Sequence, residues 1–237
     1  MAARRWTGSD GDGAGAGTGA SSAGAPWIRT GSAASGLMLV LFLLLHLAGV
    51  ALAPLDPQRF EVYAAALHRS AWLPLAELAL LAAALVHLGL SLARVLSNRR
   101  AGNTAVLRSR RGDGLAALAA RSQAAGGAVL LGFLVVHLQQ LRWPRPAAGG
   151  ELAALQAVLA QPFNLLLYLA AALALALHLL HGGEAAHRSL GVLDPANGGR
   201  IRRGARVLAM LLGTGFAGVT AMLALVLPLA PAGAGLP

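Results

Sequence analysis

Five long apolar segments constrain this chain more than any other feature of its sequence. They cover about residues 34–54, 72–94, 119–141, 162–182 and 205–229. Each segment has roughly the 20 residues that an α-helix needs to cross the hydrocarbon core of a bilayer. Only 12% of the residues are charged, against about 25% in an average soluble domain. We therefore expect an all-α integral membrane protein with five transmembrane helices, multi-pass in the cell (inner) membrane.

The five segments divide the chain into one membrane domain and two short tails. The membrane domain is expected over about residues 32–230. Residues 1–31 are rich in glycine and alanine, a composition typical of a disordered tail. Residues 231–237 are expected to form a short C-terminal tail.

Arginine placement predicts how the helices are oriented. All 19 basic residues are arginine, and the net charge is +10. The N-terminal tail and the loops 95–118 and 183–204 are rich in arginine, whereas the loops 55–71 and 142–161 have two each. The positive-inside rule then puts the N-terminus in the cytoplasm and the C-terminus outside. Because topology accounts for these arginines, we expect no nucleic-acid partner.

Four of the seven histidines lie well inside the first four apolar segments, one in each. They are His46, His87, His137 and His178. A polar ring in the bilayer core is costly, so such residues are functional candidates. Counting about 1.5 Å per residue from the helix ends puts His87 and His178 in the inner half and the other two in the outer half.

Two pairs of histidines at two depths can hold two haems in a four-helix bundle. Neutral imidazoles are common axial ligands of haem iron, and facing helices of a bundle can hold a cofactor between them. The alternative is that the histidines pack between helices and form hydrogen bonds with their neighbours. The pattern favours a membrane electron-transfer protein.

Three further residues are candidates for the same site. His181 lies closer to the interface than His178, which depth favours as the ligand; His181 could replace it or meet a haem propionate. Arg121, at the inner start of the third segment, either serves topology or pairs with a propionate. Glu77 is the only carboxylate within a segment. It either snorkels to the interface or relays protons during quinone chemistry.

The chain contains no cysteine, which limits the chemistry that it can carry alone. Disulfides and cysteine-ligated iron–sulfur clusters are excluded. The loops are also too short to form a flavin or substrate domain. If the protein works in redox chemistry, other chains must supply those parts.

The ordered set of segments resembles a known family over about residues 32–225. The first helix, SGLMLVLFLLLHLAG, and the following EVYAAALH are similar to the two-haem cytochrome b membrane subunit of succinate dehydrogenase and fumarate reductase, in its five-helix, single-subunit form. The later segments ELALLAAALVHLGLSL, GAVLLGFLVVHL and LYLAAALALALHLLHGGEAAHRSLG match its next three ligand helices in order. The pair Arg121-Ser122 departs from a Ser-Arg pair expected there.

The resemblance implies a subunit of respiratory complex II that binds two haem b groups. By position, His87 and His178 would be the inner ligands, and His46 and His137 the outer ligands. The subunit would anchor a flavoprotein subunit and an iron–sulfur subunit to the membrane lipid. It would pass electrons between the iron–sulfur subunit and menaquinone or ubiquinone, without acting on succinate itself.

Two other functions are compatible with the sequence. The first is a cytochrome b subunit of another quinone-linked oxidoreductase, of the hydrogenase, formate dehydrogenase or nitrate reductase type. It shares the haems but has other soluble partners. The second is a haem-free membrane transporter or structural protein, which would show no Soret band.

Overall fold

The computed structural model describes residues 26–100 and 112–226, and over these residues the protein is a bundle of helices without strands. Five helices are long and apolar enough to cross a membrane, which confirms the predicted all-helical fold and is compatible with a multi-pass membrane protein. They are α1 (Pro26–Val50), extended by the short α2 (Leu52–Leu55); α4 (Leu73–Arg100); α6 (Gln123–His137), extended by the π-helical turn η1 (Leu138–Arg142); α8 (Pro162–Ser189); and α9 (Gly198–Ala221), extended by η2 (Met222–Val226).

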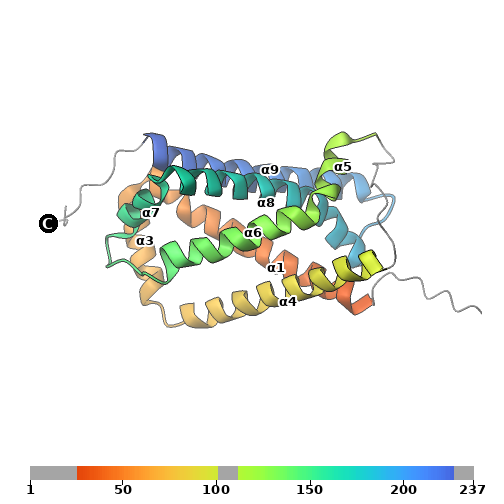
Figure 1. Ribbon diagram of the computed structural model, residues 1–237. Helices are drawn as coiled ribbons and strands as arrows, with labels where there is room; N and C mark the ends of the chain where they lie inside the picture. Colours follow the sequence, from red (N-terminus) through yellow and green to blue (C-terminus); the bar gives the residue numbers. More distant parts are fainter. Residues whose placement is uncertain (1–25, 101–111, 227–237) are drawn as a thin grey trace, which may run out of the picture.

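Shorter helices lie at the two ends of the bundle (Figure 1). Helices α3 (Pro57–Arg69) and α7 (Glu151–Leu159) lie at one end, here called the α7 end. Helix α5 (Gly114–Arg121) lies at the opposite end, the α5 end, together with the connection from α8 to α9. The long helices alternate in direction between these ends, as a chain that crosses a membrane repeatedly requires.

Helix α8 is central to the packing, since it contacts α1, α6 and α9. Helix α4 packs mainly on α1. A buried cluster joins α1, α8 and α9, with Leu47, Leu175, Leu179, Ala209 and Leu212 at its centre. Small residues let α8 and α9 approach closely, because a Cβ atom on Gly213 would lie only 2.7 Å from that of Ala176. Such small contacts are typical of helix pairs in membranes.

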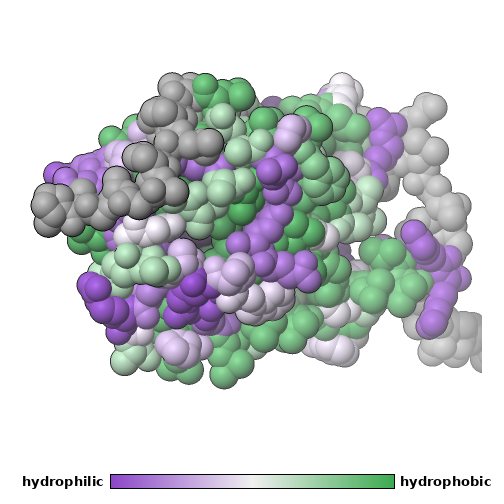
Figure 2. Space-filling view, turned by 60° about the vertical axis from the view of Figure 1, so that its left-hand side comes forward, coloured by the Kyte–Doolittle hydropathy of each residue, from purple (hydrophilic) through white to green (hydrophobic). Residues whose placement is uncertain are grey.

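Leucines on the outer faces of the long helices are exposed, as expected for surfaces that face lipid. On α4 these include Leu81, Leu85 and Leu92, each more than half exposed. Figure 2 shows hydrophilic residues gathered over the α7 end, beside a mainly hydrophobic flank. This distribution fits a membrane-spanning bundle because hydrocarbon cannot satisfy exposed polar groups.

Three of the spanning helices begin at residues other than those predicted from the sequence, and α4 and α8 extend further at their C-terminal ends, to Arg100 and Ser189. Helix α1 begins at Pro26, so residues 26–31 are helical rather than part of a disordered tail; proline is favoured at a first helical position. The third spanning helix begins at Gln123 rather than 119, because the chain turns at Ser122 and α5 forms a separate helix. Helix α9 begins at Gly198 instead of 205. Residues 1–25 and 231–237, predicted as tails, lie outside the described residues.

The loops predicted at 55–71 and 142–161 contain α3 and α7, which are fastened together by a carboxylate. The side chain of Glu61 accepts hydrogen bonds from the backbone N–H groups of Leu152, at 2.8 Å, and Glu151, at 3.3 Å. It therefore satisfies donors that the first turn of α7 leaves unpaired. Burial raises the pKa of the Glu61 carboxyl.

Candidate functional site

The four intramembrane histidines come together in two pairs inside the bundle. His46 of α1 and His137 at the end of α6 have ring centres 6.0 Å apart, with planes at 79°. His87 of α4 and His178 of α8 have ring centres 6.3 Å apart, with planes at 70°. The partners are those expected from counting residues along the helices, and each pair joins segments that are far apart in the sequence.

These separations fit two imidazoles on opposite sides of one metal ion. An imidazole nitrogen lies roughly 2 Å from its metal, and the ring centre lies about 1.1 Å beyond it, so two opposed rings have centres about 6.3 Å apart. Among the described residues, no group of three or more His, Cys, Asp or Glu side chains could hold a metal ion. Two protein ligands per centre suit haem, whose iron accepts axial ligands from the protein while the macrocycle supplies the rest.

The ring of His87 is fixed by α1. Its Nδ1 atom lies 3.0 Å from the carbonyl oxygen of Ser32 and 3.5 Å from Oγ of Ser35. A carbonyl only accepts, so Nδ1 carries the proton and Nε2 keeps a free lone pair. Metal-binding histidines usually have their second nitrogen engaged in this way. Gly36 makes room for the ring, since a Cβ atom there would lie 3.0 Å from Cε1 of His87.

Two buried polar atoms at His178 lack a hydrogen-bond partner. Its Nδ1 atom and Oε1 of Gln123 are buried without a hydrogen-bond partner, whereas Nε2 of Gln123 lies 3.3 Å from Nε2 of His178. Exchanging the two ends of the Gln123 amide would still leave Nδ1 of His178 unpaired. As placed, the Gln123 amide nitrogen donates to Nε2 of His178, so Nδ1 carries the ring proton and has no acceptor, a state that buried polar groups normally avoid.

Aromatic rings enclose the second pair. They are Phe42, Phe133, Tyr168 and Phe216. Phe42 stacks on His46 with ring centres 5.3 Å apart and planes at 14°. The hydroxyl of Tyr168 lies 3.1 Å from Nδ1 of His137. In the described part of the chain, aromatic rings therefore border this pair, and the Tyr168 hydroxyl gives His137 a polar contact.

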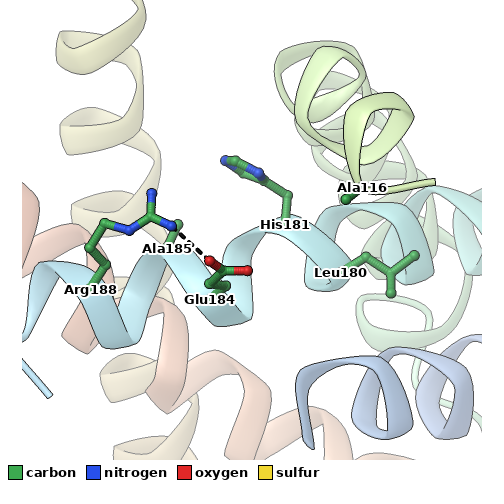
Figure 3. A pocket seen from close by; sticks show the side chains of 6 residues that line it. All are labelled: Ala116, Leu180, His181, Glu184, Ala185 and Arg188. Atoms are coloured by element: carbon green, nitrogen blue, oxygen red, sulfur yellow. Dashed lines mark hydrogen bonds and ion pairs between the residues drawn. The ribbon is translucent and has the colours of Figure 1, made fainter. Parts of the chain in front are cut away.

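His181 lies outside both pairs. It lines a small pocket of about 80 Å³ at the α5 end with Ala116, Leu180, Glu184, Ala185 and Arg188. Figure 3 shows its ring above the ion pair that joins Arg188 to Glu184 at 2.8 Å. Because His178 is the residue opposite His87, the geometry favours His178 as the ligand. Arg121 ends α5 with an exposed side chain, and the structure gives it no contact with the pairs.

Glu77 has a partner that the sequence did not reveal. Both of its carboxylate oxygens accept hydrogen bonds from Arg142, at 2.7 and 2.5 Å, and a nitrogen of Arg145 lies 3.9 Å away. Arg142 ends the third spanning helix near the α7 end, at the level where Glu77 begins the second. The carboxylate therefore has its charge balanced by a fork-shaped guanidinium.

Sequence reasoning missed several polar residues around the pairs. Ser32 and Gln123 contact the pair of His87 and His178, and Tyr168 contacts the pair of His46 and His137. Gln140 and Asn164 continue the contacts from Tyr168. The sequence could have indicated these residues, since each is a polar side chain in an apolar helix. Only the structure shows which neighbours their side chains face.

Comparison of the chain with protein-family models, with curated proteins and with solved structures finds no match.

Proposed function

We propose that this chain is the membrane-anchor dihaem cytochrome b subunit of a succinate:quinone oxidoreductase. The observation that carries the proposal is the presence of two histidine pairs with ring centres 6.0 and 6.3 Å apart. The geometry supports a membrane cytochrome with two bis-histidine haems. The assignment to succinate, and to menaquinone or ubiquinone, rests on the sequence resemblance.

The chain's own residues have distinct roles in this proposal. His46 and His137 would hold one haem b, and His87 and His178 the other. Bound haem supplies one-electron redox chemistry. The carbonyl of Ser32 orients His87, while His181 and Arg121 are at the end where propionates would need cationic or hydrogen-bonding partners.

The distribution of arginine supports the docking of soluble subunits at the α5 end. Described arginines there include Arg29, Arg99, Arg100, Arg121, Arg188, Arg200, Arg202, Arg203 and Arg206. The α7 end has Arg59, Arg69, Arg142 and Arg145. By the positive-inside rule the α5 end faces the cytoplasm. A flavoprotein and an iron–sulfur subunit would dock there, and the pair of His87 and His178 is the nearer one.

The direct test is the haem content of the purified chain together with its electron donor. We expect two b-type haems per polypeptide in a pyridine haemochrome assay, and reduction of both by succinate in membranes that hold the complex. Zero or one haem would contradict the proposal. Reduction by hydrogen or formate, with no response to succinate, would instead identify a cytochrome b of another quinone-linked oxidoreductase.

Replacing Glu77 by glutamine tests whether its carboxylate serves quinone chemistry. Quinone reduction needs protons that hydrocarbon cannot supply, so loss of the carboxylate should slow succinate–quinone turnover by at least about tenfold. Both haems and succinate–dye activity should persist. Asp56→Asn is the matched control, because Asp56 is a carboxylate near the same end that pairs with the exposed Arg59. Unchanged quinone turnover would show that Glu77 serves only as the ion-pair partner of Arg142.

A further inference from the structure

A chain of side chains connects His137 to the backbone of α7. Nδ1 of His137 lies 3.1 Å from the Tyr168 hydroxyl, which donates to Oε1 of Gln140 at 3.1 Å. Nε2 of Gln140 donates to Oδ1 of Asn164 at 2.9 Å, and Nδ2 of Asn164 donates to the carbonyl of Val158 at 2.9 Å. Four side chains from two helical segments thus end on one backbone acceptor.

The backbone acceptor fixes the direction of every bond in this chain. A carbonyl oxygen can only accept, so the amide nitrogen of Asn164 must face Val158 and its oxygen must face Gln140. That oxygen requires the amide nitrogen of Gln140, which leaves the Gln140 oxygen to accept the single hydroxyl proton of Tyr168. The Tyr168 oxygen then has only lone pairs to offer His137.

From this order we infer that Tyr168, Gln140 and Asn164 are positioning residues that hold His137 in the Nδ1–H tautomer, with Nε2 left unprotonated as an iron ligand. The inference rests on the proposed haem function for its ligand, but the tautomer itself depends only on the hydrogen bonds. At the outer pair, side chains would thus fix the tautomer of the ligand. At the inner pair, the backbone carbonyl of Ser32 fixes the tautomer of His87.

The same chain should tune the electronic character of the ligand. An N–H group that donates to an acceptor makes the opposite ring nitrogen a stronger electron donor, and such outer partners adjust metal affinity and potential. Loss of the acceptor should therefore weaken donation from His137 and favour reduced iron. The ring of His46, by contrast, lies against the aromatic rings of Phe42 and Phe216.

Tyr168→Phe tests the inference, and Tyr63→Phe is the matched control. The chain has two tyrosines, and the ring of Tyr63 packs beside Gly49 near the same end. In the purified protein, Tyr168→Phe should retain both haems and raise the midpoint potential of one haem while the other stays unchanged. Tyr63→Phe should leave both potentials unchanged. Equal potentials in Tyr168→Phe and the parent protein would overturn the tuning role.

Nitrogen-15 NMR of histidine-labelled protein tests the tautomer separately, with His137 assigned by its absence in His137→Gln. We expect a protonated Nδ1 that exchanges slowly with solvent in the parent and in Tyr63→Phe, and quickly in Tyr168→Phe. An Nε2–H tautomer, or exchange that Tyr168→Phe does not change, would overturn the inference. Absence of haem from the parent protein would contradict the proposed function, while the same spectrum of the haem-free chain would still decide the tautomer.

Discussion

Replacing His178 by alanine is expected to lower the haem content from two per chain to one. His178 and His87 have ring centres 6.3 Å apart, which fits two axial ligands of one iron. Alanine has no donor atom, so the inner haem should lose a ligand while the outer pair stays intact. His87→Ala should remove the same spectral component, whereas His46→Ala and His137→Ala should both remove the other.

Two measurements check this result. A pyridine haemochrome assay counts the haems, and a redox titration shows which of the two components is absent. His181→Gln is the control, because His181 lies one turn along α8 from His178 and lines a separate pocket; both haems should persist. The pairing would be wrong if His46→Ala and His87→Ala abolished the same component. Loss of the inner haem in His181→Gln, with retention in His178→Gln, would assign the ligand to His181.

Replacing Gly36 by alanine should weaken the binding of the inner haem without unfolding the bundle. The new Cβ atom would lie 3.0 Å from Cε1 and 3.2 Å from Nδ1 of His87. The ring would have to move from the carbonyl of Ser32, which holds its Nδ1–H group. Changes to such supporting contacts typically lower metal affinity by about tenfold to a hundredfold, and we expect a loss of inner-haem affinity in this range.

Gly127→Ala is the matched control for Gly36→Ala. Its Cβ atom would lie 3.7 Å from Cε1 of His178, which is an ordinary van der Waals contact on the other side of the same pair. Alanine is a better helix former than glycine by about 1 kcal/mol, so neither substitution should weaken its own helix. Haem titration of both variants, with helicity measured by circular dichroism, checks the result. Equal affinity for the inner haem in the two variants would show that Gly36 does not determine the position of the His87 ring.

The amino-acid sequence by itself determined the helical architecture of this protein. Five apolar segments predicted five spanning helices, since a bilayer leaves few alternatives to helices for backbone hydrogen bonding. It also indicated which histidines share a depth, because rise per residue in a helix is nearly constant. His87 with His178, and His46 with His137, followed from counting alone. Helix ends were less predictable, since hydropathy does not register the turn at Ser122 or the helical start at Pro26.

Only the tertiary structure decided what surrounds those histidines. Depth along a helix does not fix rotation about its axis, so the sequence could not show that Tyr168 meets His137 or that Gln123 meets His178. The pairing of Glu77 with Arg142 likewise required the second and third spanning helices to begin and end side by side. Contacts between distant segments depend on how the helices pack. A hydropathy pattern gives the length of each helix and the depth of each residue, but not the side to which a side chain points.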